Sequence, residues 1–129
     1  MADPVWVDRA VVDLVHDLLL AEYGGAGGTR DGGLIDSAIA RARNKAAYED
    51  PDLATLAAAY AYGLARNHGY VDGNKRAAAA TMGVFLDLNG FELVVPEPEL
   101  VGITLALAAG ELEEAPLANW IRAHLQAKR

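Results

Sequence analysis

The stretch His68–Asn89, HGYVDGNKRAAAATMGVFLDLN, decides the fold and carries the least expected charges of the chain. Its second part, Ala77–Asn89, is apolar almost all the way round, and a helix of that kind is typically buried in a core. The first turn of this helix starts with Lys75 and Arg76, at the end where the helix dipole is already positive. A bound anion would make this arrangement favourable, because free backbone N–H groups, a flexible Gly73 and two cations form a phosphate cradle.

A histidine and a carboxylate precede this cradle by about one helical turn. His68 is a candidate proton acceptor and Asp72 a candidate metal ligand, and together with the cradle they predict phosphoryl or nucleotidyl transfer. Each residue also has a structural interpretation. His68 could be a core histidine that extends the apolar stripe before it, and Asp72 could be a helix cap. Gly73 and Asn74 are common turn formers.

The composition limits the classes of protein to which this chain can belong. A length of 129 residues, with 53% hydrophobic residues and five prolines, predicts one helical domain over residues 1–129. The absence of cysteine excludes disulfides and thiolate metal sites. A net charge of −7 argues against direct nucleic-acid binding. The sequence shows neither a secretory signal nor an apolar run of about 18 residues, so we expect a cytoplasmic protein without a membrane span.

Apolar residues at helical spacing predict three helices before the motif. The first covers about residues 8–23, with an inner face of Val11, Leu14, Val15, Leu18 and Leu19. A glycine-rich loop at residues 24–28 separates it from a second helix at about 33–44. Residues 44–50 lack a clear apolar face and are predicted to form a surface loop or short hairpin. Asp50-Pro51 then predicts the N-cap of the third helix, whose apolar stripe ends at His68.

The segment after the motif adds the remaining elements of the fold. Asn89-Gly90 predicts a left-handed end of the buried helix, and residues 91–95 favour one short strand. Two more helices are expected at about 98–109 and 116–128. The prediction is therefore an all-α, compact bundle of about six helices around one buried central helix. Tyr70 is expected to insert its ring into the core, and His16 and His124 to be surface or packing residues.

The residues from His68 to Arg76 resemble the signature of the Fic/Doc family, H-x-F-x-[DEN]-[GA]-N-[GK]-R, in a loop that leads into a buried helix. Lys75 makes the chain look like the Doc (death-on-curing) branch, the toxins of bacterial toxin–antitoxin pairs. Further stretches fit Doc-like positions, so that the resemblance covers most of the chain: Tyr23-Gly24-Gly25, Ala47-Tyr48-Glu49 and Gly110-Glu111.

The resemblance implies ATP with Mg²⁺ and group transfer onto a protein hydroxyl. Fic proteins transfer AMP, whereas Doc transfers the γ-phosphate to elongation factor Tu and stops translation. By analogy, His68 would be the catalytic base and Asp72 would hold the magnesium. The phosphate-binding residues would be Gly73, Asn74, Lys75 and Arg76, with Lys75 also setting the position of the triphosphate. The implied partners are a Phd-like antitoxin and the target protein.

The chain departs from the family pattern at two positions. Tyr70 replaces the phenylalanine of the signature, so its hydroxyl needs a partner. Ala79 replaces a second arginine of Fic enzymes, which argues against AMP transfer and against self-inhibition by an internal glutamate. Residues 44–50 match the family's flap, so the resemblance implies that Ala47, Tyr48 and Glu49 dock the target by strand addition. The alternatives are AMP transfer to a protein hydroxyl and a non-catalytic binding module.

Overall fold

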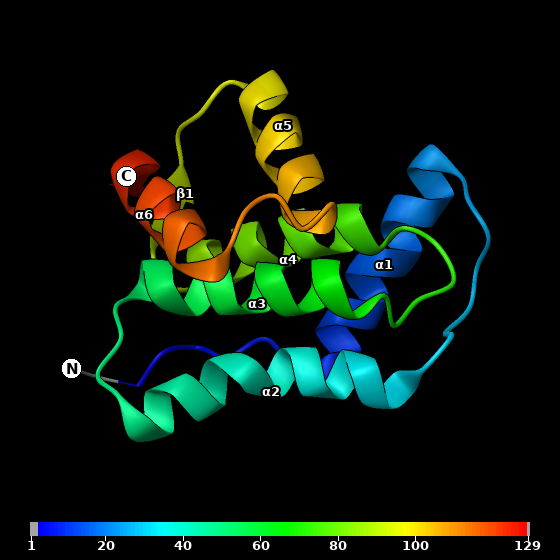
Figure 1. Cartoon of the computed structure of the whole chain (residues 1–129), viewed down its shortest axis with the longest axis horizontal. Coiled ribbons are helices and arrows are strands. Elements are labelled where there is room, and N and C mark those ends of the chain that lie inside the picture. Colours follow the sequence, from blue (N-terminus) through cyan, green and yellow to red (C-terminus); the bar gives the residue numbers. More distant parts are fainter. Residues whose placement is uncertain (1–2, 129) are drawn as a thin grey trace.

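The computed structural model describes residues 3–128, so residues 1, 2 and 129 of the predicted domain lie outside the described part. Six helices and a two-stranded sheet make up this part, as Figure 1 shows, and the prediction of an all-α bundle is confirmed. The elements are α1 (Arg9–Tyr23), α2 (Gly32–Tyr48), α3 (Leu53–Asn67), α4 (Asn74–Leu88), β1 (Phe91–Leu93), α5 (Glu97–Ala108), α6 (Glu114–His124) and β2 (Leu125–Ala127).

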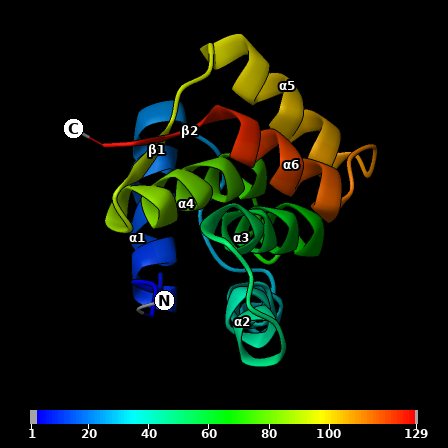
Figure 2. The same cartoon turned by 90° about the vertical axis from the view of Figure 1, so that its left-hand side faces the viewer.

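Helices α2, α3 and α4 lie in a stack with α3 in the middle, and α1 packs beside α4 (Figure 2). Helix α6 packs on α3, and α5 packs on both α3 and α4, on the side away from α2. Ten residues of α3 and six of α4 are buried, so these two helices form most of the core. Small residues let α2 and α3 approach closely. A Cβ atom on Gly63 would lie only 2.9 Å from the Cα atom of Ala38.

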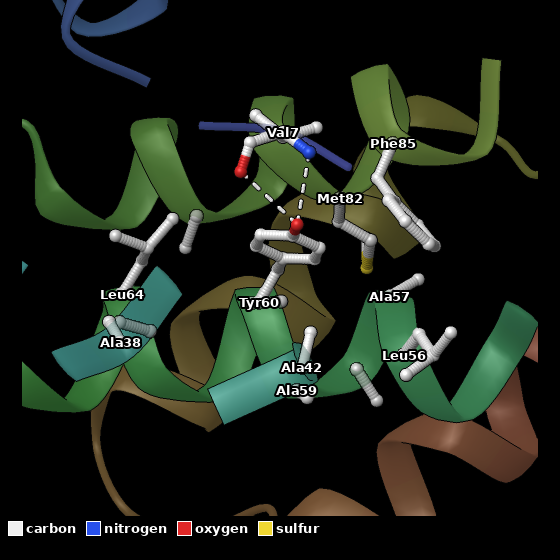
Figure 3. Close-up of a cluster of buried hydrophobic side chains, with 14 of the residues drawn as sticks. Val7, Ala38, Ala42, Leu56, Ala57, Ala59, Tyr60, Leu64, Met82 and Phe85 are labelled. Atoms are coloured by element: carbon white, nitrogen blue, oxygen red, sulfur yellow. Dashed lines mark hydrogen bonds between the residues drawn. The ribbon is translucent and has the colours of Figure 1, made fainter. Parts of the chain in front are cut away.

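A buried tyrosine ties the chain before α1 to the core (Figure 3). The Tyr60 hydroxyl accepts a hydrogen bond from the Val7 N–H at 3.0 Å and donates one to the Val7 oxygen at 3.2 Å. The Tyr60 ring packs against Phe85 of α4, with ring centroids 5.1 Å apart. Both polar atoms of Val7 are therefore satisfied inside the protein, as buried backbone groups require.

The predicted inner face of α1 is right in part: Val11 packs against the core, but Leu14 and Leu18 do not belong to this face. The buried side chains are Val12 and His16, whereas Leu14 and Leu18 are 57% and 61% exposed. Leucines and valines are so frequent in this helix that two overlapping apolar stripes fit its sequence. The structure buries the stripe that contains His16, because this ring gains a hydrogen bond that hydropathy does not score.

The link between α2 and α3 also differs from the prediction. Helix α2 continues to Tyr48, so a loop or hairpin at residues 44–50 is wrong for most of that segment. Lysine and alanine favour the helix there, and Lys45 forms an ion pair with Glu114 of α6 at 3.4 Å. The N-cap of α3 is Asp52 instead of Asp50. Its Oδ1 accepts from the Thr55 N–H at 2.9 Å, and its carboxylate also binds Arg122.

The chain after α4 forms a small sheet of two strands, of which only the first was predicted. Gly90 has a φ of +88°, as expected for the end of α4, and the strand β1 follows at Phe91–Leu93. The last helix ends at His124, four residues before the predicted end, because the following residues pair with β1 as the antiparallel strand β2. Among residues 3–128, every helix is too short or too polar to cross a membrane.

Candidate active site

Helix α3 ends in a tight turn that carries His68. This residue has φ 52° and ψ 49°, and it is the one non-glycine residue with positive φ among residues 3–128. The side chain of Arg30 binds the end of α3, with Nε donating to the His68 oxygen at 2.8 Å and Nη2 to the Asn67 oxygen at 3.2 Å. The left-handed turn removes the His68 ring from the apolar stripe of α3. His68 is exposed, so its interpretation as a core histidine is wrong.

Gly69 and Tyr70 anchor the loop in the core. Gly69 packs so closely that a Cβ atom there would lie 2.3 Å from Cγ1 of Ile35. Tyr70 is 3% exposed, which confirms the predicted insertion of its ring, and its hydroxyl donates to Asp13 of α1. Burial, together with this hydrogen bond, raises the pKa of the Tyr70 hydroxyl above its usual value. The partner that this extra hydroxyl required is therefore Asp13.

Asn74 holds the loop through its side chain. Its Oδ1 accepts from the Tyr70 N–H and its Nδ2 donates to the Tyr70 oxygen, both at 3.0 Å. The two hydrogen bonds satisfy both polar backbone atoms of a buried residue. They also occupy Oδ1 and one of the two N–H groups of Nδ2, so the backbone N–H and the second N–H of Nδ2 are the donors of Asn74 that remain for a phosphate.

The loop between α1 and α2 lies directly beside the motif. Arg30 N–H and Asp31 N–H both donate to the Gly69 oxygen, at 2.8 and 2.9 Å, and Val71 N–H donates to the Gly28 oxygen at 3.1 Å. The Ala26 N–H donates to Oδ2 of Asp72 at 3.3 Å. The glycines of residues 24–28 predict a loop, but nothing in the sequence indicates this contact.

The start of α4 presents unpaired donors. Gly73 is the N-cap, with a φ of +80°, and its N–H donates to Oδ1 of Asp72 at 2.8 Å. The first bond of the helix runs from the Ala77 N–H to the Gly73 oxygen. The N–H groups of residues 74–76 therefore have no acceptor within the helix. Together with the helix dipole and the exposed Lys75 and Arg76, they give this end the character of an anion site.

A hollow of about 740 Å³ opens at this end of α4. It is lined by His68 and residues 71–76 of the motif, by Tyr23 of α1 and by the exposed side of α5, which contributes Glu97, Val101 and Leu105. The Arg76 guanidinium lies over the Tyr23 ring, 4.5 Å from its centroid. A second hollow of about 530 Å³ shares His68 and Lys75 with the first and reaches Glu111. Nothing in the sequence indicated that α5 would face the motif.

The number of carboxylates near the motif limits the kind of metal site that can form there. Residues 3–128 contain no cluster of three or more metal-binding side chains. Asp72 is exposed at the hollow, and Glu97 is the other acidic residue that lines it. Magnesium commonly takes one or two carboxylates and completes its coordination with water and substrate phosphates. Asp72 therefore fits a magnesium ion that binds together with a nucleotide.

The Fic/DOC family model matches residues 6–86, which contain every element that lines the motif except α5. The chain belongs to the Fic/Doc family. It is 36% identical over 109 residues to a protein named "Protein kinase doc" from Escherichia phage P1, which covers 84% of this chain and 86% of the relative. It is 47% identical over 73 residues to "Toxin Doc" from Mycolicibacterium smegmatis, covering 55% and 56%. These similarities support a Doc-type toxin function and a kinase-type enzyme for this chain.

The structure brings together six of the predicted site residues of this Fic/Doc chain and leaves three apart. His68, Asp72, Gly73, Asn74, Lys75 and Arg76 line one hollow. Ala47, Tyr48 and Glu49 lie at the opposite end of α3, the left end in Figure 1. A helix of the 15 residues of α3 is about 22 Å long, so these three residues are remote from His68.

Proposed function

We propose that this Doc-type chain transfers the γ-phosphate of ATP to a hydroxyl of a target protein. One observation carries the proposal: His68, the exposed carboxylate of Asp72 and the cation-bearing start of α4 line a single hollow. Phosphoryl transfer needs chiefly positioning and neutralisation of charge, and a helix start with two cations supplies both. The 36% identity to a relative named as a protein kinase supports the same reaction.

His68 is the proposed general base. It lines both hollows, so it lies where a hydroxyl in one could meet a phosphate in the other. The imidazole would take the proton of the target hydroxyl while the new oxygen–phosphorus bond forms and the bond to ADP breaks. Histidine is the side chain that most often serves as a general base in proteins.

The phosphates would bind the start of α4. We assign their contacts to the N–H groups of residues 74–76 and to the side chains of Lys75 and Arg76. Asn74 would contribute its backbone N–H, while its side-chain amide is held in place by two hydrogen bonds to Tyr70. Asp72 would hold Mg²⁺, which supplies charge neutralisation to the phosphate oxygens when it is bound.

The proposed partners follow from the family and from the loops beside the motif. For a Doc-type toxin they are an antitoxin of the Phd type and a translation factor, elongation factor Tu, whose modification would arrest translation in the cytoplasm. We place target docking on the loop between α1 and α2 instead of on residues 47–49. This loop already pairs with the motif through Thr29 and Tyr70, and its exposed backbone suits strand addition.

Two labelled forms of ATP test the proposed reaction. The purified protein and a cell lysate would be incubated with ATP labelled on either the α- or the γ-phosphate. We expect protein labelling from γ alone, and its loss in His68→Ala, which should keep the wild-type melting temperature because the ring is exposed. Labelling from α would instead show nucleotidyl transfer. Labelling from neither form would support a non-catalytic module.

A further inference from the structure

His16 is a buried polar side chain that takes no direct part in the proposed transfer. It lies on α1 and is 2% exposed. Its Nε2 is 2.7 Å from the backbone oxygen of Asp72, in the middle of the motif. A carbonyl oxygen only accepts hydrogen bonds, so Nε2 carries a proton and donates it. The His16 side chain thus holds the backbone of the motif at Asp72, the residue proposed to bind magnesium.

The ring of His16 is itself held in place. It stacks on the Tyr70 ring with centroids 3.7 Å apart and planes 9° apart. The Tyr70 hydroxyl donates to Asp13, about one turn before His16 on α1. Asp13 in turn pairs with Arg9 at 3.0 Å. The imidazole therefore cannot turn away from Asp72 without displacing a buried tyrosine.

The peptide between Asp72 and Gly73 is the place where this anchor acts. The Asp72 oxygen points to His16, and the Gly73 N–H points the other way, to Oδ1 of Asp72 at 2.8 Å. Gly73 has a φ of +80°, but glycine adopts negative φ about as readily, so local geometry does not fix this peptide. Its rotation would exchange the two groups and place a carbonyl oxygen beside the Asp72 carboxylate. Negative charge would then face the phosphate site.

We propose that His16 is a positioning residue that fixes the Asp72–Gly73 peptide and so keeps the start of α4 competent for an anion. The fit is close, because a Cβ atom on Gly73 would lie 3.3 Å from Nε2 of His16. The role rests on the proposed function, since the anion in question is the triphosphate. It acts through the backbone and needs no contact between His16 and the nucleotide.

The test compares two substitutions of His16 with a matched control. His16→Leu introduces an apolar side chain of similar size that has no donor, whereas His16→Gln keeps an N–H donor. The control is His124→Leu, since His124 also binds a carbonyl oxygen, that of Trp120 at 2.8 Å, but does so within α6. Calorimetry would give the Kd of Mg²⁺-ATP for each variant, and the melting temperature would show that each is folded. A crystal structure of His16→Leu would show the orientation of the Asp72–Gly73 peptide.

We expect His16→Leu to weaken Mg²⁺-ATP binding by roughly five- to tenfold, the effect of losing one ordinary hydrogen bond. His16→Gln should recover most of this loss, His124→Leu should bind like the wild type, and the peptide should be turned or mixed in His16→Leu. Wild-type affinity and an unchanged peptide in folded His16→Leu would overturn the proposal, as would equal losses in the Gln and Leu variants. A wild type that transfers no phosphate would instead refute the proposed function, and the peptide orientation would still test His16.

Discussion

At the scale of single residues, the motif divides into groups that face the hollow and groups that hold the loop. His68, Lys75 and Arg76 are exposed, and Asp72 has its carboxylate at the surface. Tyr70 is buried, and the amide of Asn74 is bonded to it. The sequence predicted which nine residues belong together, because their charges conflict with a helix start. It could not separate these two groups, since an asparagine in a turn can bind either a ligand or its own backbone.

Asn74 should matter mainly for stability. Asn74→Ala removes both hydrogen bonds to the backbone of buried Tyr70, and we expect it to lower the free energy of unfolding by about 1–3 kcal/mol. Urea unfolding would measure this loss, with Asn44→Ala on the exposed side of α2 as the control. An Asn74→Ala variant of wild-type stability that no longer binds Mg²⁺-ATP would show that the amide contacts the phosphates after all.

Lys75 should set the direction in which the triphosphate binds. In Lys75→Gly the nucleotide loses a cation shared by both hollows, so we expect weaker γ-phosphate transfer and some labelling from the α-phosphate. Ala79, in place of the second arginine of Fic enzymes, should keep this second activity low. Separately labelled ATP measures both reactions. Unchanged γ-transfer would remove Lys75 from the proposed mechanism.

At the scale of elements, hydrophobic spacing was a reliable guide to the number of helices and a poor one to their faces and ends. The buried stripe of α1 differs from the predicted one because it includes a histidine, whose hydrogen-bond partner lies 56 residues away. The predicted end of α2 came too early because the residue that pairs with Lys45, Glu114, lies on α6. Strand β2 was missed because it exists only through pairing with β1. Each error concerns a contact between distant parts of the chain.

The N-cap of α3 leads to a prediction about acid stability. The hydrogen bond from Arg122 lowers the pKa of Asp52 far below its usual value, and the bonds from Thr55 act in the same direction. A carboxyl with a depressed pKa in the folded state stabilises the fold above its unfolded pKa of about 3.9, and the contribution is lost as the pH falls. The wild type should therefore be more stable than Asp52→Asn near pH 7. We expect a difference of about 1 kcal/mol, kept small because both side chains are half exposed.

Urea unfolding of both proteins between pH 7 and pH 3 would check this. The difference in unfolding free energy should be constant down to about pH 5 and should shrink below it. Within residues 3–128, exposed Asp17 forms no ion pair with a lysine or arginine, so Asp17→Asn makes a suitable control. A difference that stays constant down to pH 3 would show that the charge of Asp52 does not stabilise α3.

At the scale of the whole molecule, α1, α2 and α3 converge on the motif loop, and α5 closes the hollow over it. The conformation of the motif loop therefore depends on contacts with these helices as well as on the residues of the signature. Gly69 packs on α2, Tyr70 and the Asp72 oxygen are held from α1, and the end of α3 is bound by Arg30. The sequence predicted the bundle and its signature. It could not place Glu97, Val101 and Leu105 opposite the motif, because their position depends on how α5 packs.

A crystal structure with Mg²⁺ and a non-hydrolysable ATP analogue tests the central claim most directly. We predict that phosphate oxygens accept hydrogen bonds from the N–H groups of residues 74–76 and that Asp72 binds the metal. The γ-phosphorus should be the one that faces His68. A nucleotide bound away from the start of α4, or one that presents its α-phosphorus to His68, would contradict the account.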